Sequence, residues 1–168
     1  KITLYRGDNK KGSCEKIKYV GTGSNYYVSF ADDDLIYPEN YYEYLISGVE
    51  KYNAYVSLHG RIMKPGPYTN YYEGHKIAYR ALDTVNEDHE VDIASNCGSV
   101  FKRDFFNDLD KWYDMIEHGN MDDIYTNYWA KKAGVKRMIL KHESDFLKHK
   151  HQKKSDNYVY DAHRHNCV

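Results

Sequence analysis

The fold expected for this chain is decided by the stretch Ser29-Phe30-Ala31-Asp32-Asp33-Asp34-Leu35-Ile36-Tyr37-Pro38. Its apolar beginning continues a strand-like run over residues 26–31, and that run leads directly into three consecutive carboxylates. Neighbouring acids repel one another at neutral pH, so a fold that keeps them together usually holds a cation. Mg²⁺ and Mn²⁺ bind carboxylate oxygens and often leave coordination positions for substrate phosphates. The triplet is therefore a candidate metal–diphosphate site, and the alternative interpretation is a solvated acidic turn.

A helical segment and a second strand follow the triplet. Residues 38–52 place Leu45 and Val49 on one apolar face, and a proline at the start suits the first turn of a helix. Residues 54–59 form another short apolar strand. Strand, helix and strand within about 35 residues make a βαβ unit, which predicts a parallel sheet with a right-handed crossover.

The rest of the chain has weaker patterns. We expect loop-rich chain over 61–86, strand and turn over 91–102, helices over 104–117 and 121–133, and a final strand over 135–140. The sequence shows neither an internal repeat nor a linker composition. The expectation is therefore one α/β domain over residues 1–145, followed by a polar tail rich in Lys and His over residues 146–168.

Composition narrows the possible functions. The 168 residues suffice for one domain with a core, and a net charge of −1 argues against a general nucleic-acid binder, which would be strongly basic. The sequence has no run of about 18 apolar residues that would predict a membrane span. The three cysteines Cys14, Cys97 and Cys167 are odd in number and widely spaced. We interpret them as unpaired thiols in a reducing compartment and expect a cytoplasmic protein.

A second acidic pair strengthens the case for a site. Asp122 and Asp123 open the helix that precedes the final strand. Taken alone, such a pair complements the helix dipole. However, ligands of open parallel α/β sheets bind beyond the carboxyl ends of the strands, which is where the Asp32–Asp34 triplet is expected. Two acidic clusters on one side of a sheet suit a metal site and a general base.

Five stretches, in the order in which they occur, resemble motifs of family-2-like, GT-A type glycosyltransferases. They are residues 9–16, residues 30–38 with a D-x-D pattern, residues 57–61, the glycine-containing stretch 92–101, and residues 121–135 with an acidic pair at a helix start. The resemblance covers roughly residues 9 to 145. It implies a GT-A-like (Rossmann-like) fold, with a mostly parallel sheet flanked by helices. In such enzymes two β-α units precede the metal strand, so the resemblance also implies that the N-terminal part of the nucleotide-binding region is missing.

The resemblance implies a metal-dependent and inverting transfer of a sugar from a nucleotide-sugar, with a UDP-sugar as the first candidate, to a hydroxyl of a glycan or another acceptor. Asp34 would be the direct ligand of Mn²⁺ or Mg²⁺, with Asp32 and a late histidine, His142, as further ligands. Asp32, Asp33 and Lys16 would contact the donor.

On the acceptor side, the resemblance implies that Asp123 takes the proton of the attacking hydroxyl, with Asp122 as the alternative base. Asn96, Gly98 and Ser99 would lie against the acceptor. The short N-terminal part leaves open that a second chain or an oligomer completes the site.

Two other functions remain open from the sequence. A haloacid-dehalogenase type phosphatase would use Asp32 as nucleophile and Asp34 as acid–base, with Asp122 and Asp123 holding Mg²⁺, although Ile36 stands where that family's motif has Thr or Val. A non-catalytic module that binds sugars or nucleotides is the other alternative.

Overall fold

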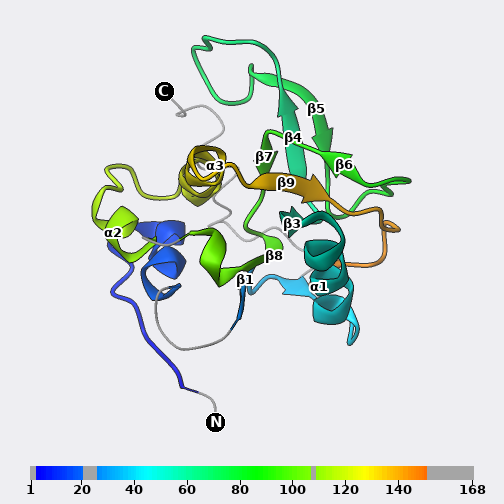
Figure 1. The fold of residues 1–168 in the computed structure, drawn as a ribbon, viewed down its shortest axis with the longest axis horizontal. Helices are drawn as coiled ribbons and strands as arrows, with labels where there is room; N and C mark the ends of the chain where they lie inside the picture. Colours follow the sequence, from blue (N-terminus) through cyan, green and yellow to red (C-terminus); the bar gives the residue numbers. More distant parts are fainter. Residues whose placement is uncertain (1–2, 21–25, 107–108, 151–168) are drawn as a thin grey trace.

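The computed structural model describes residues 3–20, 26–106 and 109–150 (Figure 1). Its centre is a five-stranded sheet in the order β1-β8-β3-β9-β6. The strands are β1 (Tyr27–Ala31), β8 (Gly98–Lys102), β3 (Ala54–Ser57), β9 (Lys136–Ile139) and β6 (His89–Glu90). The fold is thus a mixed α/β fold, and the strands expected before the acidic triplet, after the first helix and near residue 140 are confirmed.

The sheet is mixed, and the expectation of a mostly parallel sheet was wrong. Among the described strands only β3 and β9 pair in parallel, whereas β8 lies between β1 and β3 and is antiparallel to both. The first four residues of β8 are buried, which is typical of a strand covered on both faces. Because β8 separates them, β1 and β3 do not form the adjacent parallel pair that their βαβ spacing predicts.

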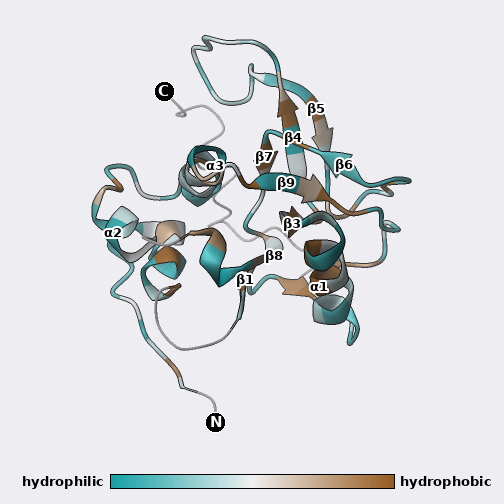
Figure 2. Cartoon of the chain, viewed as in Figure 1, coloured by the Kyte–Doolittle hydropathy of each residue, from teal (hydrophilic) through white to brown (hydrophobic). Residues whose placement is uncertain are grey.

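Two layers of helices cover the sheet. On one face, α1 (Tyr41–Tyr52) buries Leu45 and Val49 against Val56 of β3 and Val100 of β8. These positions confirm the helical face expected from the sequence. The ring of Tyr41 is also buried there. Figure 2 shows the apolar colouring concentrated on the central strands and on the inner side of α1.

The other face packs against α3 (Asp122–Lys132) and the 3-10 helix η1 (Gly12–Tyr19). Tyr55 and Phe101 lie on this face together with Trp129 and Ile17. Side chains alternate between the two faces of a strand, so neighbours such as Tyr55 and Val56 belong to different core clusters. Gly134 follows α3 with a φ of 71°, a left-handed conformation that favours glycine after a helix.

A smaller sheet of three strands adjoins the central one. It has the order β5-β4-β7 and consists of β4 (Gly60–Met63), β5 (His75–Tyr79) and β7 (Ile93–Ala94). The hairpin of β4 and β5 lies in the region expected to be loop-rich, so that expectation was incomplete. The helix expected over 104–117 is confirmed only in part, because the structure has η2 (Arg103–Phe105) and, within the expected range, the shorter α2 (Leu109–Asp114).

The chain after residue 145 continues to pack on the domain for a few residues. Leu147 is 1% exposed, and β10 (Lys148–His149) pairs with β2 (Leu35–Ile36) in a short antiparallel ribbon. The remainder of the expected tail, residues 151–168, lies outside the described residues, as does Cys167.

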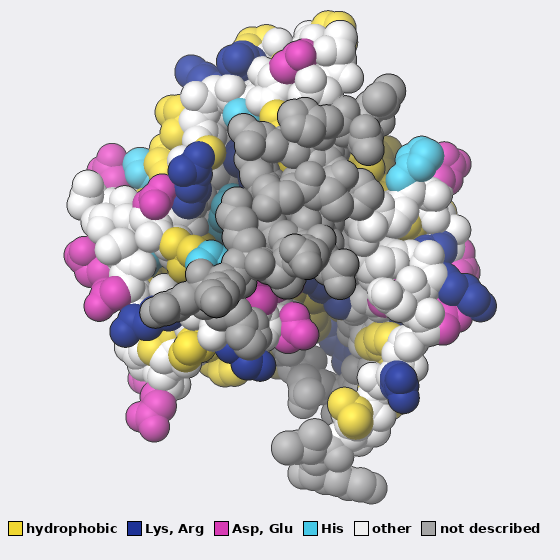
Figure 3. All heavy atoms as spheres, turned by 180° about the vertical axis from the view of Figure 1, so that it is seen from behind, with side chains coloured by type: hydrophobic (Ala, Val, Ile, Leu, Met, Phe, Trp, Pro, Cys, Tyr) yellow, Lys and Arg dark blue, Asp and Glu magenta, His cyan; other side chains and the backbone are white. Residues whose placement is uncertain are grey.

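Across the described ranges, no helix is long and apolar enough to cross a membrane. Seen from behind, the described side chains that are visible show acidic and basic groups intermixed and not one extended basic patch (Figure 3). This pattern agrees with the near-zero net charge of −1.

Candidate functional site

The site lies at one edge of the central sheet. β1 ends at Ala31, which pairs with Gly98 at the start of β8, and Ser99 of β8 pairs with Ser57 at the end of β3. Because β8 runs against both neighbours, its first residues lie beside the last residues of β1 and β3. The segments after β1 and β3 and the segment before β8 therefore converge at this edge.

The acidic loop after β1 is held by one tyrosine hydroxyl. The Oη atom of Tyr37 accepts a hydrogen bond from the amide of Asp32 at 2.8 Å. It also lies 2.9 Å from the carbonyl oxygens of Asp32 and Cys97, one of which receives its proton. The carboxylate of Asp32 pairs with Nζ of Lys16 at 3.0 Å. Burial raises the pKa of Asp32, and the ammonium of Lys16 opposes this rise.

Asp122 is enclosed in a network of donors. Its carboxylate accepts hydrogen bonds from Oγ of Ser13 and, at 3.0 Å, from Nδ2 of Asn96, and it lies 3.3 Å from Nζ of Lys16. Burial disfavours the charged form, but Lys16 and the two donors outweigh it and lower the pKa of Asp122. Lys16 therefore connects the acidic loop with the start of α3, and the two carboxylates that it contacts raise its own pKa against the effect of burial.

Asp123 is the more accessible acid. Its Oδ1 accepts hydrogen bonds from the amide of Asn96 at 2.7 Å and from Oγ of Ser95 at 3.2 Å, while its side chain is 26% exposed. Nη1 of Arg61 lies 4.0 Å from its Oδ2. Burial and the neighbouring Asp122 raise the pKa of Asp123 to about 6. A carboxylate with such a pKa is suited to accept a proton near neutral pH.

The start of α3 is fixed in place by Asn127. Its side-chain amide exchanges two hydrogen bonds with the backbone of Ala94, one at 2.8 Å and one at 2.6 Å. This contact attaches α3 to β7, which leads directly into Ser95. The acidic pair is consequently held at the same sheet edge as the Asp32–Asp34 loop.

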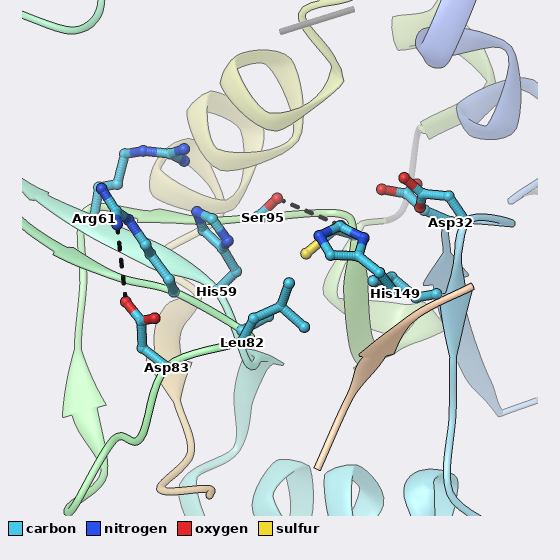
Figure 4. Close-up of a pocket in the computed structure, with 12 residues that line it drawn as sticks. Asp32, His59, Arg61, Leu82, Asp83, Ser95 and His149 are labelled. Carbon is cyan, nitrogen blue, oxygen red and sulfur yellow. Dashed lines mark hydrogen bonds and ion pairs between the residues drawn. The ribbon is translucent and has the colours of Figure 1, made fainter. Parts of the chain in front are cut away.

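A cavity of about 420 Å³ opens at this edge (Figure 4). This volume lies within the range of small-molecule sites, roughly 300–1,000 Å³. Its lining residues come from five separate segments: Asp32, Asp34, Leu35, His59, Arg61, Arg80, Ala81, Leu82, Asp83, Ser95, Cys97 and His149. Figure 4 shows His149 reaching in from β10, between Asp32 and Ser95. Carboxylates, guanidinium groups and imidazoles therefore face one cavity.

The structure brings together some of the residues predicted from the sequence. Asp32 and Asp34 line the cavity, and Asp123 contacts two of its lining residues, Ser95 and Arg61. Lys16 binds Asp32 behind the cavity wall. Asp33, by contrast, is exposed and is not among the lining residues.

The predicted acceptor residues do not face the cavity. Asn96 and Ser99 are 0% exposed and Gly98 is buried within β8. Asn96 and Ser99 both bond to the hydroxyl of Tyr55, and the carbonyl of Gly98 accepts a hydrogen bond from Ser57 at 3.0 Å. Complete burial leaves these side chains no surface for an acceptor, so their role is to hold the sheet edge together.

His142 is not among the cavity-lining residues either, although it contacts one of them, Arg80. It is 7% exposed, and its ring nitrogens lie 2.8 Å from the carbonyl oxygen of Leu140 and 3.3 Å from that of Arg80. The late histidine that does line the cavity is His149. Sequence position favoured His142 because it directly follows the last strand, whereas only the pairing of β10 with β2 brings His149 into place.

Sequence reasoning also missed His59, Arg61 and Arg80. His59 and Arg61 stand at the end of a predicted strand, and that position could have indicated a role for them. Arg80 lies in a stretch without pattern, and its place in the cavity depends on the β4–β5 hairpin.

The donor set fits a divalent cation that arrives with a phosphorylated ligand. In the part of the chain that the structure describes, no group of three or more His, Cys, Asp or Glu side chains forms a preassembled metal cage. Asp32 and Asp34 nevertheless place carboxylates at one cavity. Mg²⁺ and related ions are commonly held by one or two carboxylates plus substrate phosphates, so a full protein cage is not required.

Comparison with known proteins assigns no family to this chain. No protein-family model matches its sequence. No curated protein matches it either.

Proposed function

We propose that this chain is a GT-A-like, metal-dependent and inverting glycosyltransferase that moves a sugar from a nucleotide-sugar to an acceptor hydroxyl. The observation that carries the proposal is the convergence of two acidic sites at one cavity. Asp32 and Asp34 line it, and Asp123 contacts its wall through Ser95 and Arg61. The five sequence motifs that resemble this class of enzyme support the same assignment.

In this proposal the Asp32–Asp34 loop binds the diphosphate end of the donor. A Mn²⁺ or Mg²⁺ ion held by Asp34 and Asp32 would neutralise the negative charge of the diphosphate. Tyr37 fixes the loop through the amide of Asp32. Lys16 holds the carboxylate of Asp32 in place at 3.0 Å, which keeps two neighbouring acids together before any ligand binds.

Asp123 acts on the acceptor. Two donors, the amide of Asn96 and the hydroxyl of Ser95, occupy its Oδ1, which leaves Oδ2 to take the proton of the attacking hydroxyl. Asp122 is less suited to this role because its oxygens are already bound by Ser13, Asn96 and Lys16. Direct attack by the activated hydroxyl on the anomeric carbon would invert its configuration.

The donor is tested by a panel of nucleotide-sugars, scored by release of nucleoside diphosphate with Mn²⁺, with Mg²⁺ and with chelator. We expect metal-dependent release from one donor, and we expect Asp34→Ala to abolish both release and metal-dependent donor binding. The comparison variant Asp33→Ala removes the adjacent but exposed carboxylate and should cause a far smaller loss.

Normal donor and metal binding by Asp34→Ala would overturn the site assignment. Metal-dependent donor binding without any release, across the whole panel and with added glycan acceptors, would favour a non-catalytic binding module.

A further inference from the structure

The cavity wall at His59 and Arg61, and Tyr71 packed against Arg61, carry polar atoms that no described residue satisfies as a hydrogen-bond partner. Nε and Nη1 of Arg61, Nε2 of His59 and Oη of Tyr71 are buried without a hydrogen-bond partner among the described residues. The contact of Arg61 with Asp123, at 4.0 Å, is too long for a hydrogen bond. Buried polar groups in folded proteins are normally paired, so a group of unpaired atoms around one cavity calls for an explanation.

These atoms are placed as a unit on the β3–β4–β5 segment. Arg61 stands on β4, and its guanidinium lies over the ring of Tyr71 at 5.2 Å from the centroid. The ring of Tyr71 in turn packs edge-on against His75, with centroids 4.6 Å apart. These ring contacts restrict the guanidinium to one side of the hairpin. Its unpaired nitrogens are therefore held in a defined position at the cavity wall.

The polar groups of this wall favour a ligand group that is negatively charged and accepts hydrogen bonds. A guanidinium has only donors and is permanently charged, and the tyrosine hydroxyl adds another donor. Burial and the nearby Arg61 lower the pKa of His59 to about 3, so its imidazole is neutral and offers one donor and one acceptor nitrogen but no charge. A carboxylate or a phosphate offers the oxygen atoms that such a wall lacks.

The position of Arg61 indicates which substrate supplies the anion. Figure 4 shows Asp32 and Arg61 at opposite ends of the labelled cavity wall, with His59 and Ser95 between them. The diphosphate of the donor belongs to the Asp32–Asp34 end. Arg61 instead lies beside Asp123, where the acceptor hydroxyl must lie to lose its proton.

We infer that Arg61, together with Tyr71 and His59, forms a subsite for an anionic group of the acceptor, so that the enzyme glycosylates an acidic sugar or a sugar phosphate. This inference rests on the proposed function, and it adds the charge of the acceptor, which the five motifs do not indicate. The anion is a carboxylate or a phosphate bound to the guanidinium, and the attacking hydroxyl lies within reach of Asp123. A neutral acceptor would leave Nε and Nη1 of Arg61 with poorer hydrogen-bond partners than an anion provides, and the site discriminates against it for that reason.

The test is a direct binding measurement that requires neither donor nor metal. The full chain is titrated in a calorimeter with glucuronate for the carboxylate, with glucose 6-phosphate for the phosphate, and with glucose as the neutral reference. We expect one of the two anions to bind at least about tenfold more tightly than glucose, as hydrogen bonds to a charged group provide. The anion that binds identifies the source of the charge.

Variants locate the binding. Arg61→Met should reduce the affinity for the anion by about tenfold or more, and Tyr71→Phe by a smaller factor. Arg61→Lys keeps the charge but loses the planar fork, and an intermediate loss is expected. Lys76→Met is the matched control, because it removes one positive charge from the same hairpin at an exposed position. Thermal unfolding of each variant shows that it is folded.

Equal binding of the anions and glucose by the unmodified chain would overturn the inference. Unchanged anion affinity in folded Arg61→Lys and Tyr71→Phe would do the same. The two proposals can fail separately. Anion binding through Arg61 without any nucleoside diphosphate release would retain the subsite and overturn the proposed function. Donor turnover with equal binding of charged and neutral probes would retain the proposed function and overturn the subsite.

Discussion

The two sides of the start of α3 differ in how completely their polar atoms are paired. On the η1 side, the side chain of Asp122 is 12% exposed and is bound by Ser13, Asn96 and Lys16. On the hairpin side, Asp123 is 26% exposed and Arg61 has two buried nitrogens without a described partner. A network that satisfies its own polar groups stabilises the fold, whereas unpaired groups at a cavity are available to a ligand. The sequence shows two adjacent aspartates, and the structure gives them different surroundings.

The largest effect is expected from Asp123→Asn. An asparagine keeps an oxygen for the hydrogen bonds from Ser95 and Asn96, but it cannot take a proton. We expect transfer to fall by roughly 10²- to 10⁴-fold, which is the usual contribution of a general base. Donor binding, measured by calorimetry with Mn²⁺, should stay unchanged. Transfer at the normal rate would show that the base lies elsewhere.

A large loss of stability is expected from Asp122→Ala. The variant leaves the buried amide of Asn96 and the ammonium of Lys16 with fewer partners. Breaking a buried ion pair from one side costs about 3 kcal/mol or more, so we expect a loss of that size in the free energy of unfolding by urea. Asp114→Ala removes an exposed carboxylate at the end of α2 and serves as the control. If both variants lost the same small amount, Asp122 would not be a structural residue.

The smallest effect is a pH dependence that separates the two acids. The pKa of Asp123 is raised in the folded protein, from 3.8 to about 6, so folding favours its protonated form. Its contribution to stability is complete below about pH 4 and is lost as the pH rises through about 6. The pKa of Asp122 is lowered, so its contribution is present above pH 3.8 and is lost as the pH falls further.

Urea unfolding between pH 3 and pH 8 measures the free energy of unfolding over both pH ranges, the one governed by Asp123 and the one governed by Asp122. Asp123→Asn should remove the decline in stability between about pH 4 and pH 6, and it should leave the loss of stability at lower pH in place. In the unmodified protein, the proposed transfer should become faster over the same interval, because the base must be deprotonated. A stability profile that Asp123→Asn leaves unaltered would mean that this carboxylate is not titrating there.

The helices and strands with a clear hydrophobic periodicity were predictable from local sequence patterns. The spacing of Leu45 and Val49 identified α1, and the apolar run before Asp32 identified β1. The position of β8 between β1 and β3 was not predictable in this way. Strand order depends on pairing between distant segments, here residues 27–31 and 98–102, and a periodic pattern within one strand carries no information on its neighbour.

Because local patterns do not show which distant segments meet, only some residues of the candidate site could be predicted. Asp32, Asp34 and Asp123 were identified because acids at a strand end and at a helix start have a local signature. Arg61 ends one of the five stretches, residues 57–61, but nothing in that stretch assigned it a role. His149 reaches the cavity only through the pairing of β10 with β2, which no local pattern indicates.

The ribbon of β2 and β10 has a consequence for detecting ligands. It pairs Leu35 with His149 and Ile36 with Lys148, and the amide of Lys150 adds a bond of 2.7 Å to the carbonyl of Asp34. So short a ribbon opens at low free-energy cost compared with the central sheet. Any molecule that contacts both Asp34 and His149 adds its binding energy to the closed form. Amide hydrogen exchange in these two short strands would therefore slow when the cavity fills, which reports occupancy even by a molecule that is never turned over.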